Sequence, residues 1–404
     1  MTQKEKILLG ILACLNFTHI MDLIIMMPLG PQLMSHFNIS PREFGFLVST
    51  YSFSAGVSGF FAAFIADKYS RKHLIMAAYT GFLIGTFACA LAPTYTTLAV
   101  ARFTAGIFGG LLGSQVMAVV GDSFNYERRA QAMGIVTTAF SVASVVGVPM
   151  GLYLTTKFSW HAPFWFVGIL GLIVWVLIWQ FMPRLDGHIN HDSDIQHSRF
   201  EAITSILKNP NQLRALWLTI TIMFGHFSII PFISPYLVGN VGFSVQNIYL
   251  IYLVGGGLTI FTAPLVGKWA DQKGKYPVFV TFALLSLIPI FLITNMTSTY
   301  LPFILFVAGI FFIFSNGRLI PTQAMTSSVV SPQHRGSFMS INSSLQLLAQ
   351  SAVVYLAGLV IEKLPNGQLV HYNWVGYSAM FFIFCSIFIA RTVKPVDANS
   401  GIVS

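Results

Sequence analysis

Charged residues are scarce in this sequence. Asp, Glu, Lys and Arg make up 9% of its 404 residues, whereas soluble domains carry roughly 25%. Hydrophobic residues make up 55% of the chain, and the mean hydropathy is +0.72. This number of charged side chains is too small to cover the surface of a protein folded in water. The composition therefore excludes an ordinary soluble protein and predicts a membrane protein.

Cysteines and catalytic motifs are sparse as well. The three cysteines, Cys14, Cys89 and Cys385, all lie within apolar runs and share no CxxC or other metal-type spacing. We expect them to be small buried side chains. The chain has no HExxH, no GxSxG and no phosphate-binding glycine loop in a suitable setting. We therefore expect no enzymatic activity, no bound metal and no cofactor.

Long apolar runs are what the sequence has instead. A bilayer core about 30 Å thick needs roughly 20 apolar residues per helix, and the chain contains 12 such runs separated by short polar breaks. The predicted fold is an all-α membrane protein with 12 transmembrane helices. The predicted spans are 7–33, 44–66, 74–93, 97–120, 131–156, 162–182, 213–238, 246–270, 277–295, 300–325, 337–361 and 373–391.

The 22 lysines and arginines are distributed unevenly about these spans. With the N-terminus inside, 17 lie on the cytoplasmic side and 3 on the outside, while Arg102 and Arg318 lie within the membrane. Because basic loops stay in the cytoplasm, both termini are predicted to be cytoplasmic, with the chain in the plasma (inner) membrane. The net charge of +9 then reflects topology. We expect contact with the lipid bilayer and none with nucleic acid.

An internal repeat divides the chain into two halves. A shift of 204 residues lays PQLMSHFNIS over PYLVGNVGFS and ADKYSRK over ADQKGKY. The same shift places Asp22 on His226, so the first helix of each half carries an ionisable group at an equivalent depth. We predict two pseudo-symmetric six-helix bundles, residues 1–183 and 213–404, joined by a cytoplasmic linker, residues 184–212.

The repeated ADKYSRK and ADQKGKY segments each place an acid at a helix end and a base four residues later. The first copy supplies Asp67 and Arg71, and the second supplies Asp271 and Lys275. A preference for basic residues on the cytoplasmic side explains the bases. It does not explain the matched acids.

These segments resemble the hallmark of the major facilitator superfamily, Gly-x-x-x-Asp-Arg-x-Gly-Arg-Lys, which lies between its second and third spans. The resemblance covers essentially the whole chain and implies transport of a small molecule by alternating access; we expect a monomer. It also implies a cytoplasmic gate in which Arg71 pairs with Asp67 or with Asp122. The residues that match or belong to this gate are Asp67, Arg71, Lys72, Asp122, Gly267, Asp271, Gly274 and Lys275, while Ala63, Lys68 and Ser70 depart from the pattern.

Two further stretches resemble the drug:proton antiporter branch, in its arabinose-efflux-permease-like form. RFTAGIFGG resembles the proton-coupling motif through Arg102 and the glycines Gly106, Gly109 and Gly110. VVGVPMG resembles the exporter motif of span five. Its matching residues are Gly147, Pro149 and Gly151, with Val148 inserted between glycine and proline. The resemblance implies an exporter. The alternatives are close helix packing at the glycines and a proline kink in span five.

Asp22, within NFTHIMDLIIMMPLGP, is the only acid deep inside a predicted span. Counted along the helices, Asp22 and Arg102 lie at a similar depth, so they can meet within the first half. A charge at mid-bilayer is costly and normally functional. Desolvation favours the protonated acid and a nearby arginine favours the carboxylate, which suits a proton carrier. The alternative is a permanent Asp22–Arg102 pair that holds two helices together.

Other polar side chains within the spans are candidates for the substrate cavity. His19 lies one turn before Asp22, and Tyr51 lies in span two. Arg318 in span ten either binds an anionic group of the substrate or pairs with carbonyls. The cavity candidates are His19, Tyr51, Arg318 and, as one polar stripe of span eleven, Asn342, Gln346 and Gln350. His226 is assigned to proton coupling with Asp22 and Arg102. Packing is the alternative for each histidine and helix association for the stripe.

The leading hypothesis is proton-coupled efflux of small organic molecules of drug, sugar or nucleobase type, with the proton gradient as energy source. The alternatives are a divalent-metal exporter using His19, Asp22 and His226, a proton-coupled importer, and a non-transporting membrane receptor. Arg102 and Arg318 make a poor environment for a metal cation. A flux assay separates a transporter from a receptor.

Overall fold

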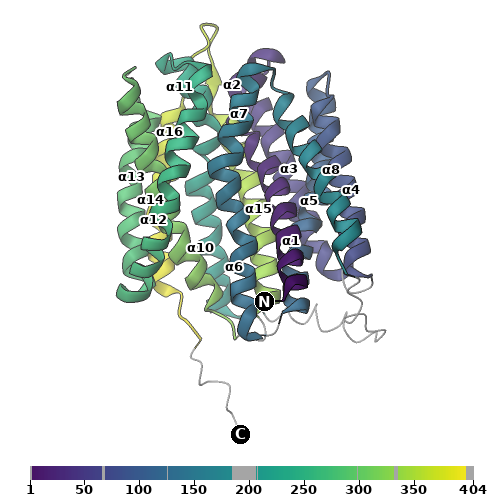
Figure 1. The fold of residues 1–404 in the computed structure, drawn as a ribbon. Helices are drawn as coiled ribbons and strands as arrows, with labels where there is room; N and C mark the ends of the chain where they lie inside the picture. Colours follow the sequence, from purple (N-terminus) through teal and green to yellow (C-terminus); the bar gives the residue numbers. More distant parts are fainter. Residues whose placement is uncertain are drawn as a thin grey trace.

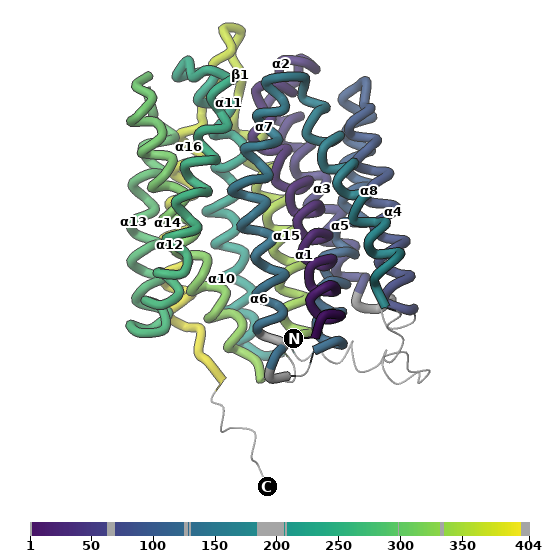
Figure 2. The backbone as a smooth tube through the Cα atoms, in the orientation of Figure 1, coloured from purple at the N-terminus to yellow at the C-terminus, as the bar shows by residue number. Residues whose placement is uncertain are grey.

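The computed structural model describes residues 2–65, 69–124, 126–183, 206, 208–297, 299–331 and 335–396. In these ranges 12 helical segments are long and apolar enough to cross a membrane, which confirms the predicted number. They run side by side in one bundle (Figure 1). The first turn of α1 and the last turn of α16 lie at the same end of the bundle (Figures 1 and 2). We call this the terminal end and the opposite one the distal end.

The N-terminal half contains spans one to six and the C-terminal half spans seven to twelve. The elements are α1 (Gln3–Ile25), α2 (Gly30–His36), α3 (Pro41–Ile65), α4 (Arg71–Ala90), α5 (Tyr95–Ser123), α6 (Tyr126–Val142), η2 (Ala143–Gly147), α7 (Val148–Lys157), α8 (Ala162–Phe181), α10 (Pro210–Phe227), α11 (Ile230–Val241), η3 (Val245–Asn247), α12 (Ile248–Lys273), α13 (Lys275–Thr294), α14 (Leu301–Ser327), α15 (Arg335–Val360), β1 (Glu362–Lys363), β2 (Leu369–Val370) and α16 (Tyr372–Thr392). Most of the predicted linker, residues 184–205 and 207, lies outside the described residues.

The first helix of each half is interrupted, which differs from the continuous spans 7–33 and 213–238 predicted above. α1 ends at Ile25 and α10 ends at Phe227, and a short turn separates each from α2 or α11. Pro28 and Pro231 explain the breaks, since a proline has no N–H to donate to the carbonyl four residues earlier. The residue before each proline is also biased away from the helical conformation.

Span five is irregular for a related reason. A π-helical turn, η2, joins α6 to α7 immediately before Pro149. Such a turn admits one extra residue into the helix and re-registers its two ends. The VVGVPMG stretch therefore does build a local distortion, as the proline-kink alternative predicts.

A two-stranded hairpin between α15 and α16 was not predicted from the sequence. β1 pairs antiparallel with β2, and the hairpin lies at the distal end beside α11 (Figure 2). Asn240 of α11 holds it in place with two bonds to one residue: its Nδ2 donates to the Leu369 oxygen at 2.9 Å and its Oδ1 accepts from the Leu369 nitrogen at 2.8 Å.

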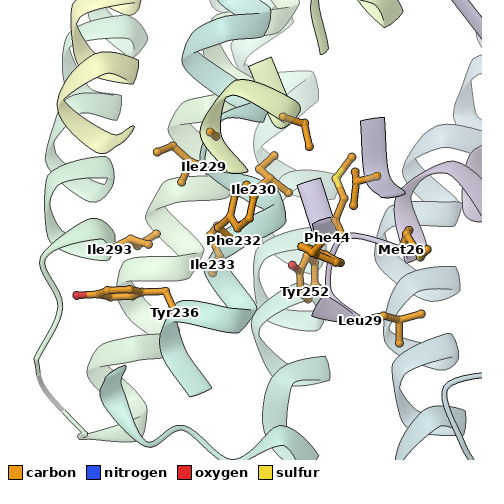
Figure 3. Packing of buried hydrophobic residues seen from close by; sticks show 14 of the residues in the cluster. Met26, Leu29, Phe44, Ile229, Ile230, Phe232, Ile233, Tyr236, Tyr252 and Ile293 are labelled. Atoms are coloured by element: carbon orange, nitrogen blue, oxygen red, sulfur yellow. The ribbon is translucent and has the colours of Figure 1, made fainter. Parts of the chain in front are cut away.

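An apolar cluster that both halves share closes the distal end. The turn after α1 and the start of α3 pack against α11 and the beginning of α12 (Figure 3). The rings of Phe44 and Phe232 meet edge to face, with centroids 5.9 Å apart. Gly45 and Gly358 let α3 and α15 approach closely, because a Cβ on Gly45 would lie 3.0 Å from the Val354 carbonyl oxygen. Burial of this cluster favours contact between the halves at the distal end.

At the terminal end the described residues form separate clusters. One consists of residues from α1, α3, α4, α5, α6 and α8 together with a few residues just outside them, and only Leu347 of the C-terminal half packs against it. Another lies wholly in the C-terminal half and contains Ala215, Leu216, Val330 and Phe338. The two halves therefore share one apolar cluster at the distal end. They also touch farther along α3 and α15, because a Cβ on Gly56 would overlap Leu348 and one on Gly59 would lie 3.5 Å from Ser344 Oγ.

Large apolar side chains are exposed around the bundle. Phe158 is 78% exposed, Phe261 73% and Ile84 62%. In water such a surface would promote aggregation, whereas in a bilayer it faces acyl chains of equal polarity.

Candidate functional site

Asp22 of α1 and Arg102 of α5 form a buried ion pair. Arg102 Nη1 donates to Asp22 Oδ2 at 2.7 Å and to the Asp22 backbone oxygen at 3.0 Å. Neither residue has any exposed surface. The hydroxyl of Thr86 in α4 adds a long hydrogen bond, 3.5 Å, to Asp22 Oδ1. Three helices therefore hold one carboxylate, and the two residues predicted to meet do so.

Tyr51 of α3 covers this pair. The Arg102 Cζ atom lies 4.3 Å from the centroid of the Tyr51 ring, a cation–π contact. The glycines of RFTAGIFGG make the approach possible, because a Cβ on Gly106 or Gly110 would overlap backbone atoms of α3 and one on Gly109 would overlap the Tyr51 hydroxyl. Close packing accounts for these glycines. A part in proton coupling stays a prediction for them.

The backbone acceptor used by Arg102 exists because α1 is interrupted. The last four carbonyls of a helix have no intrahelical N–H partner, and Asp22 is the first of the last four residues of α1. The same end carries the negative pole of the helix dipole, which favours a cation. Arg102 therefore caps a broken helix as well as pairing with a carboxylate.

Arg318 of α14 plays a similar capping role in the C-terminal half without a carboxylate. Its Nη2 donates to the Gly225 oxygen at 2.9 Å, near the interrupted end of α10, and its Nη1 donates to the Ser286 hydroxyl of α13 at 2.9 Å. Arg318 is fully buried, and its Nε has no hydrogen-bond partner within the described ranges. The carbonyl pairing offered as one alternative is therefore present. This pairing does not test the other alternative, in which Arg318 binds an anionic group of the substrate.

The two histidines of the first helices are in different surroundings and halves. His226 of α10 is 6% exposed, its ring is parallel to Phe311 at 6.5 Å, and its Nδ1 has no partner among the described side chains and backbone. His19 is half-buried beside α5, near Gly109 and Gly113. In the described part of the chain no three histidine, cysteine or acidic residues are close enough to hold a metal ion. The geometry gives the metal-exporter alternative no support.

The amide stripe of α15 divides between two roles. Asn342 is fully buried and its Oδ1 accepts the hydroxyl of Thr219 in α10 at 2.7 Å, so this amide joins two helices. Gln350 is buried with its Nε2 unpartnered among the described residues, and Gln346 is half-buried. Helix association explains the first amide, while a cavity role for the other two stays a prediction.

In the N-terminal copy of the predicted gate, Arg71 is paired. Its Nε lies 2.9 Å from Asp122 Oδ2, and its Nη1 donates to the Gln115 amide oxygen at 3.3 Å. Lys72 caps α8 by donating to the Trp179 carbonyl at 2.8 Å. These bonds lie within one half, so separation of the halves does not itself break them. Asp67 lies outside the described residues.

In the C-terminal copy, the corresponding charges are exposed. Asp271 and Lys275 both have open surface, and no ion pair joins either to another described residue. Gly274 separates α12 from α13 with φ +93°, a conformation that side-chain-bearing residues rarely adopt. A Cβ on Gly267 would meet nothing within 4 Å. Gly274 is thus explained by the turn, and Gly267 has no packing explanation.

The helix-five motif lies against the same stretch of α1 that carries Asp22. Added Cβ atoms would lie 3.1 Å from Met21 Sδ at Gly147 and 2.7 Å from Ile25 Cδ1 at Gly151. The small residues therefore let span five pack directly against the residues on either side of Asp22. An exporter role for the motif is not tested by this packing.

Several hydroxyl and amide partners were missed from the sequence: Thr86, Gln115, Thr219 and Ser286. Hydroxyl side chains in helices commonly bond to backbone oxygens three or four residues earlier, as Thr86, Thr219 and Ser286 also do here. Their other partners become visible only once the helices are placed: Thr86, Gln115 and Ser286 bond to charged side chains, and Thr219 bonds to the Asn342 amide.

The model of the Major Facilitator Superfamily matches residues 12–354 and, in a second match, 259–401. The chain belongs to this superfamily. Members are transporters and not enzymes, and they generally need no cofactor. The chain is accordingly an integral membrane protein of the superfamily's fold.

Relatives and solved structures agree over nearly the full length. The uncharacterized MFS-type transporter YceJ of Bacillus subtilis (strain 168) is 25% identical over 385 residues, 94% of each chain, and YbcL of the same organism is 22% identical over 373 residues, 92% of each. The D-xylose-proton symporter structure has a TM-score of 0.77 at 17% identity, covering 98% of this chain and 99% of that one. A bacterial homolog of the lysosomal transporter Spinster, inward-facing and unoccupied, has a TM-score of 0.72 at 16% identity, covering 97% and 98%.

Proposed function

We propose that the chain is a proton-coupled exporter of small organic molecules in the plasma membrane, acting as a monomer by alternating access. The observation that carries the proposal is the Asp22–Arg102 pair, because Asp22 is the one fully buried acid among the described residues. A buried acid held by a cation is bistable: it is stable as a paired carboxylate and, once protonated, as a neutral group that releases its partner.

Protonation of Asp22 would have a mechanical consequence. Arg102 bonds to both the carboxylate and the backbone oxygen of Asp22, next to the break between α1 and α2. A proton on the carboxyl removes the stronger bond and loosens the cap of α1. The turn after α1 belongs to the apolar cluster that closes the distal end. Proton binding is thereby linked to the contact that must open when the transporter faces the other side.

The direction of transport rests on charge and motif. If the terminal end is cytoplasmic, as the lysine and arginine distribution predicts, the shared distal cluster closes the outer side and the separate clusters lie inside. The helix-five motif packed beside Asp22 favours export. Protons would then enter from outside as substrate leaves.

The test uses proteoliposomes with an imposed pH gradient and four labelled probes: ethidium, xylose, uracil and benzoate. Wild-type protein should move at least one probe against its gradient, and Asp22→Asn should abolish this uphill movement while retaining downhill exchange. Glu362→Gln, the same chemical change at an exposed position of β1, is the matched control. Uphill transport by Asp22→Asn at the wild-type rate would refute the role of this acid.

A further inference from the structure

The C-terminal half lacks an acid that can neutralise Arg318. Residues 213–404 contain three acids: Asp271 near the end of α12 and Glu362 of β1, both exposed, and Asp397, which lies outside the described residues. An arginine is always charged in proteins. Arg318 is therefore a buried cation whose compensation consists of a carbonyl and a hydroxyl.

The unpartnered buried nitrogens of this half are nearly all donors. Within the described residues they are the Nε of Arg318, the Nδ2 of Asn342, the Nε2 of Gln350 and the Nδ1 of His226, which donates or accepts according to its tautomer. The hydroxyl of Ser315, one turn before Arg318 on α14, is also buried and unpartnered. A buried donor without an acceptor costs about 1–3 kcal/mol. The Ser228 hydroxyl is unpartnered as well, and Gln212 Oε1 in the first turn of α10 is an unpartnered acceptor among the described residues. For the buried cation Arg318, the missing partner is an acceptor with negative charge.

Three of these groups lie on adjoining stretches of α10 and α14. His226 directly follows Gly225, whose carbonyl oxygen accepts a hydrogen bond from Arg318. Ser315 shares a face of α14 with Arg318. Phe311, a further turn along, lies parallel to the His226 ring. A guanidinium Nε, a hydroxyl and an imidazole beside an aromatic ring suit a carboxylate attached to a compact apolar or aromatic body.

We infer that Arg318, with His226 and Ser315, is the binding site for the carboxylate of a small organic acid, which completes the charge balance of the C-terminal half. The inference rests on the proposed transport function and names its substrate class. Arg318 has no exposed surface in this conformation, so the acid enters in a conformation in which α10 and α14 move apart. The N-terminal half carries its own anion, Asp22, at the corresponding helix end.

Equilibrium binding without any pH gradient tests this assignment. Purified protein in lipid nanodiscs is titrated with benzoate and 1-naphthoate, and with the matched neutral amides benzamide and 1-naphthamide, using intrinsic tryptophan fluorescence and thermal shift. We expect an acid to bind at least tenfold more tightly than its amide, and Arg318→Gln to weaken the acid roughly tenfold or more. Arg391→Gln, an exposed arginine in the last turn of α16, is the matched control.

Two more variants keep the test decisive if Arg318→Gln does not fold. Arg318→Lys keeps the charge and removes the Nε donor, and His226→Phe keeps the ring beside Phe311 and removes its nitrogen atoms; each should weaken the acid. Equal binding of acid and amide, no binding of either acid, or unchanged acid binding in all three variants overturns the inference. Asp22→Asn should still bind the acid. Acid binding without uphill transport would reject the proposed function alone, and uphill transport of uncharged probes only would reject this inference alone.

Discussion

The two halves of the molecule compensate a buried arginine differently. In the N-terminal half, Arg102 bonds to a backbone carbonyl at the end of α1 and to the Asp22 carboxylate. In the C-terminal half, Arg318 bonds to a backbone carbonyl near the end of α10 and to a neutral hydroxyl. One half is electrically complete and the other is not. A complete pair suits an internal switch, whereas an incomplete one leaves room for a ligand.

The arginines are not equivalent by sequence, which makes the likeness of their surroundings more informative. The repeat shift that aligns Asp22 with His226 lays Arg102 over Phe306, far along α14 from Arg318. Each arginine lies on the fourth span of its half, α5 or α14, and bonds to the interrupted end of the first span. The two arginines differ in their position along that fourth span. The shared feature is therefore the capped helix break, and the position of the arginine is free to differ.

The largest expected effect is on the N-terminal pair. Arg102→Gln leaves Asp22 buried without its cation. It should destabilise the fold by about 3–5 kcal/mol, because an unpaired charge is costly to bury. Arg318→Gln strands no acid and should cost only about 1–3 kcal/mol. Apparent unfolding temperatures in detergent, compared for the two variants, measure this difference. The double variant Asp22→Asn with Arg102→Gln should recover stability; equal losses at Arg102 and Arg318 would contradict the comparison.

A second comparison concerns two helix glycines, Gly110 in the N-terminal half and Gly267 in the C-terminal half. Gly110→Ala should destabilise by about 1–3 kcal/mol, because the new Cβ overlaps the Ala55 carbonyl oxygen of α3. Gly267→Ala meets open space and should be neutral or stabilise α12 by about 0.5–1 kcal/mol. Thermal unfolding of the two variants provides the measurement. A stable Gly110→Ala protein would mean that α3 and α5 are not held as closely as described.

The smallest effect is expected at the two gate copies. Arg71→Gln breaks a part-buried pair with Asp122 and should lower stability by roughly 1 kcal/mol. Lys275→Gln removes an exposed charge with no described ion-pair partner and should change stability by less than about 0.5 kcal/mol. High salt should reduce the stability difference between the wild type and Arg71→Gln only slightly, since the Arg71–Asp122 pair is partly shielded from solvent. An equal response of the two variants would remove the asymmetry between the gates.

The sequence predicted the parts of this structure that depend on counting. Twelve apolar runs follow from bilayer thickness, and the meeting of Asp22 with Arg102 follows from equal depth along two helices. The pairing of Arg71 with Asp122 followed from resemblance to the superfamily. These features need only distance along a helix or a known motif.

What the sequence did not predict depends on contacts between helices. The sequence does not predict the breaks after Ile25 and Phe227, because prolines are common within membrane helices and only some interrupt them. The hairpin at Glu362–Lys363 is too short for a periodic pattern. Arg318 bonds to the carbonyl of Gly225 and to the hydroxyl of Ser286. The chain contains hundreds of carbonyls and many serines, so neither partner is distinguishable before the helices are placed.

The cap that Arg102 forms on α1 couples two properties of the protein, and the coupling acts in both directions. Because one guanidinium holds the carboxylate and the carbonyl of a single residue, the affinity of Asp22 for a proton and the angle between α1 and α2 share one free energy. If protonation of Asp22 shifts the angle between α1 and α2, a forced change in that angle shifts the proton affinity of Asp22 by the same free energy. If Asp22 exchanges its proton as proposed, a lipid, an inhibitor or a mutation that alters only the turn at Pro28 would change the proton affinity of Asp22 from the distal surface, without touching either charged side chain.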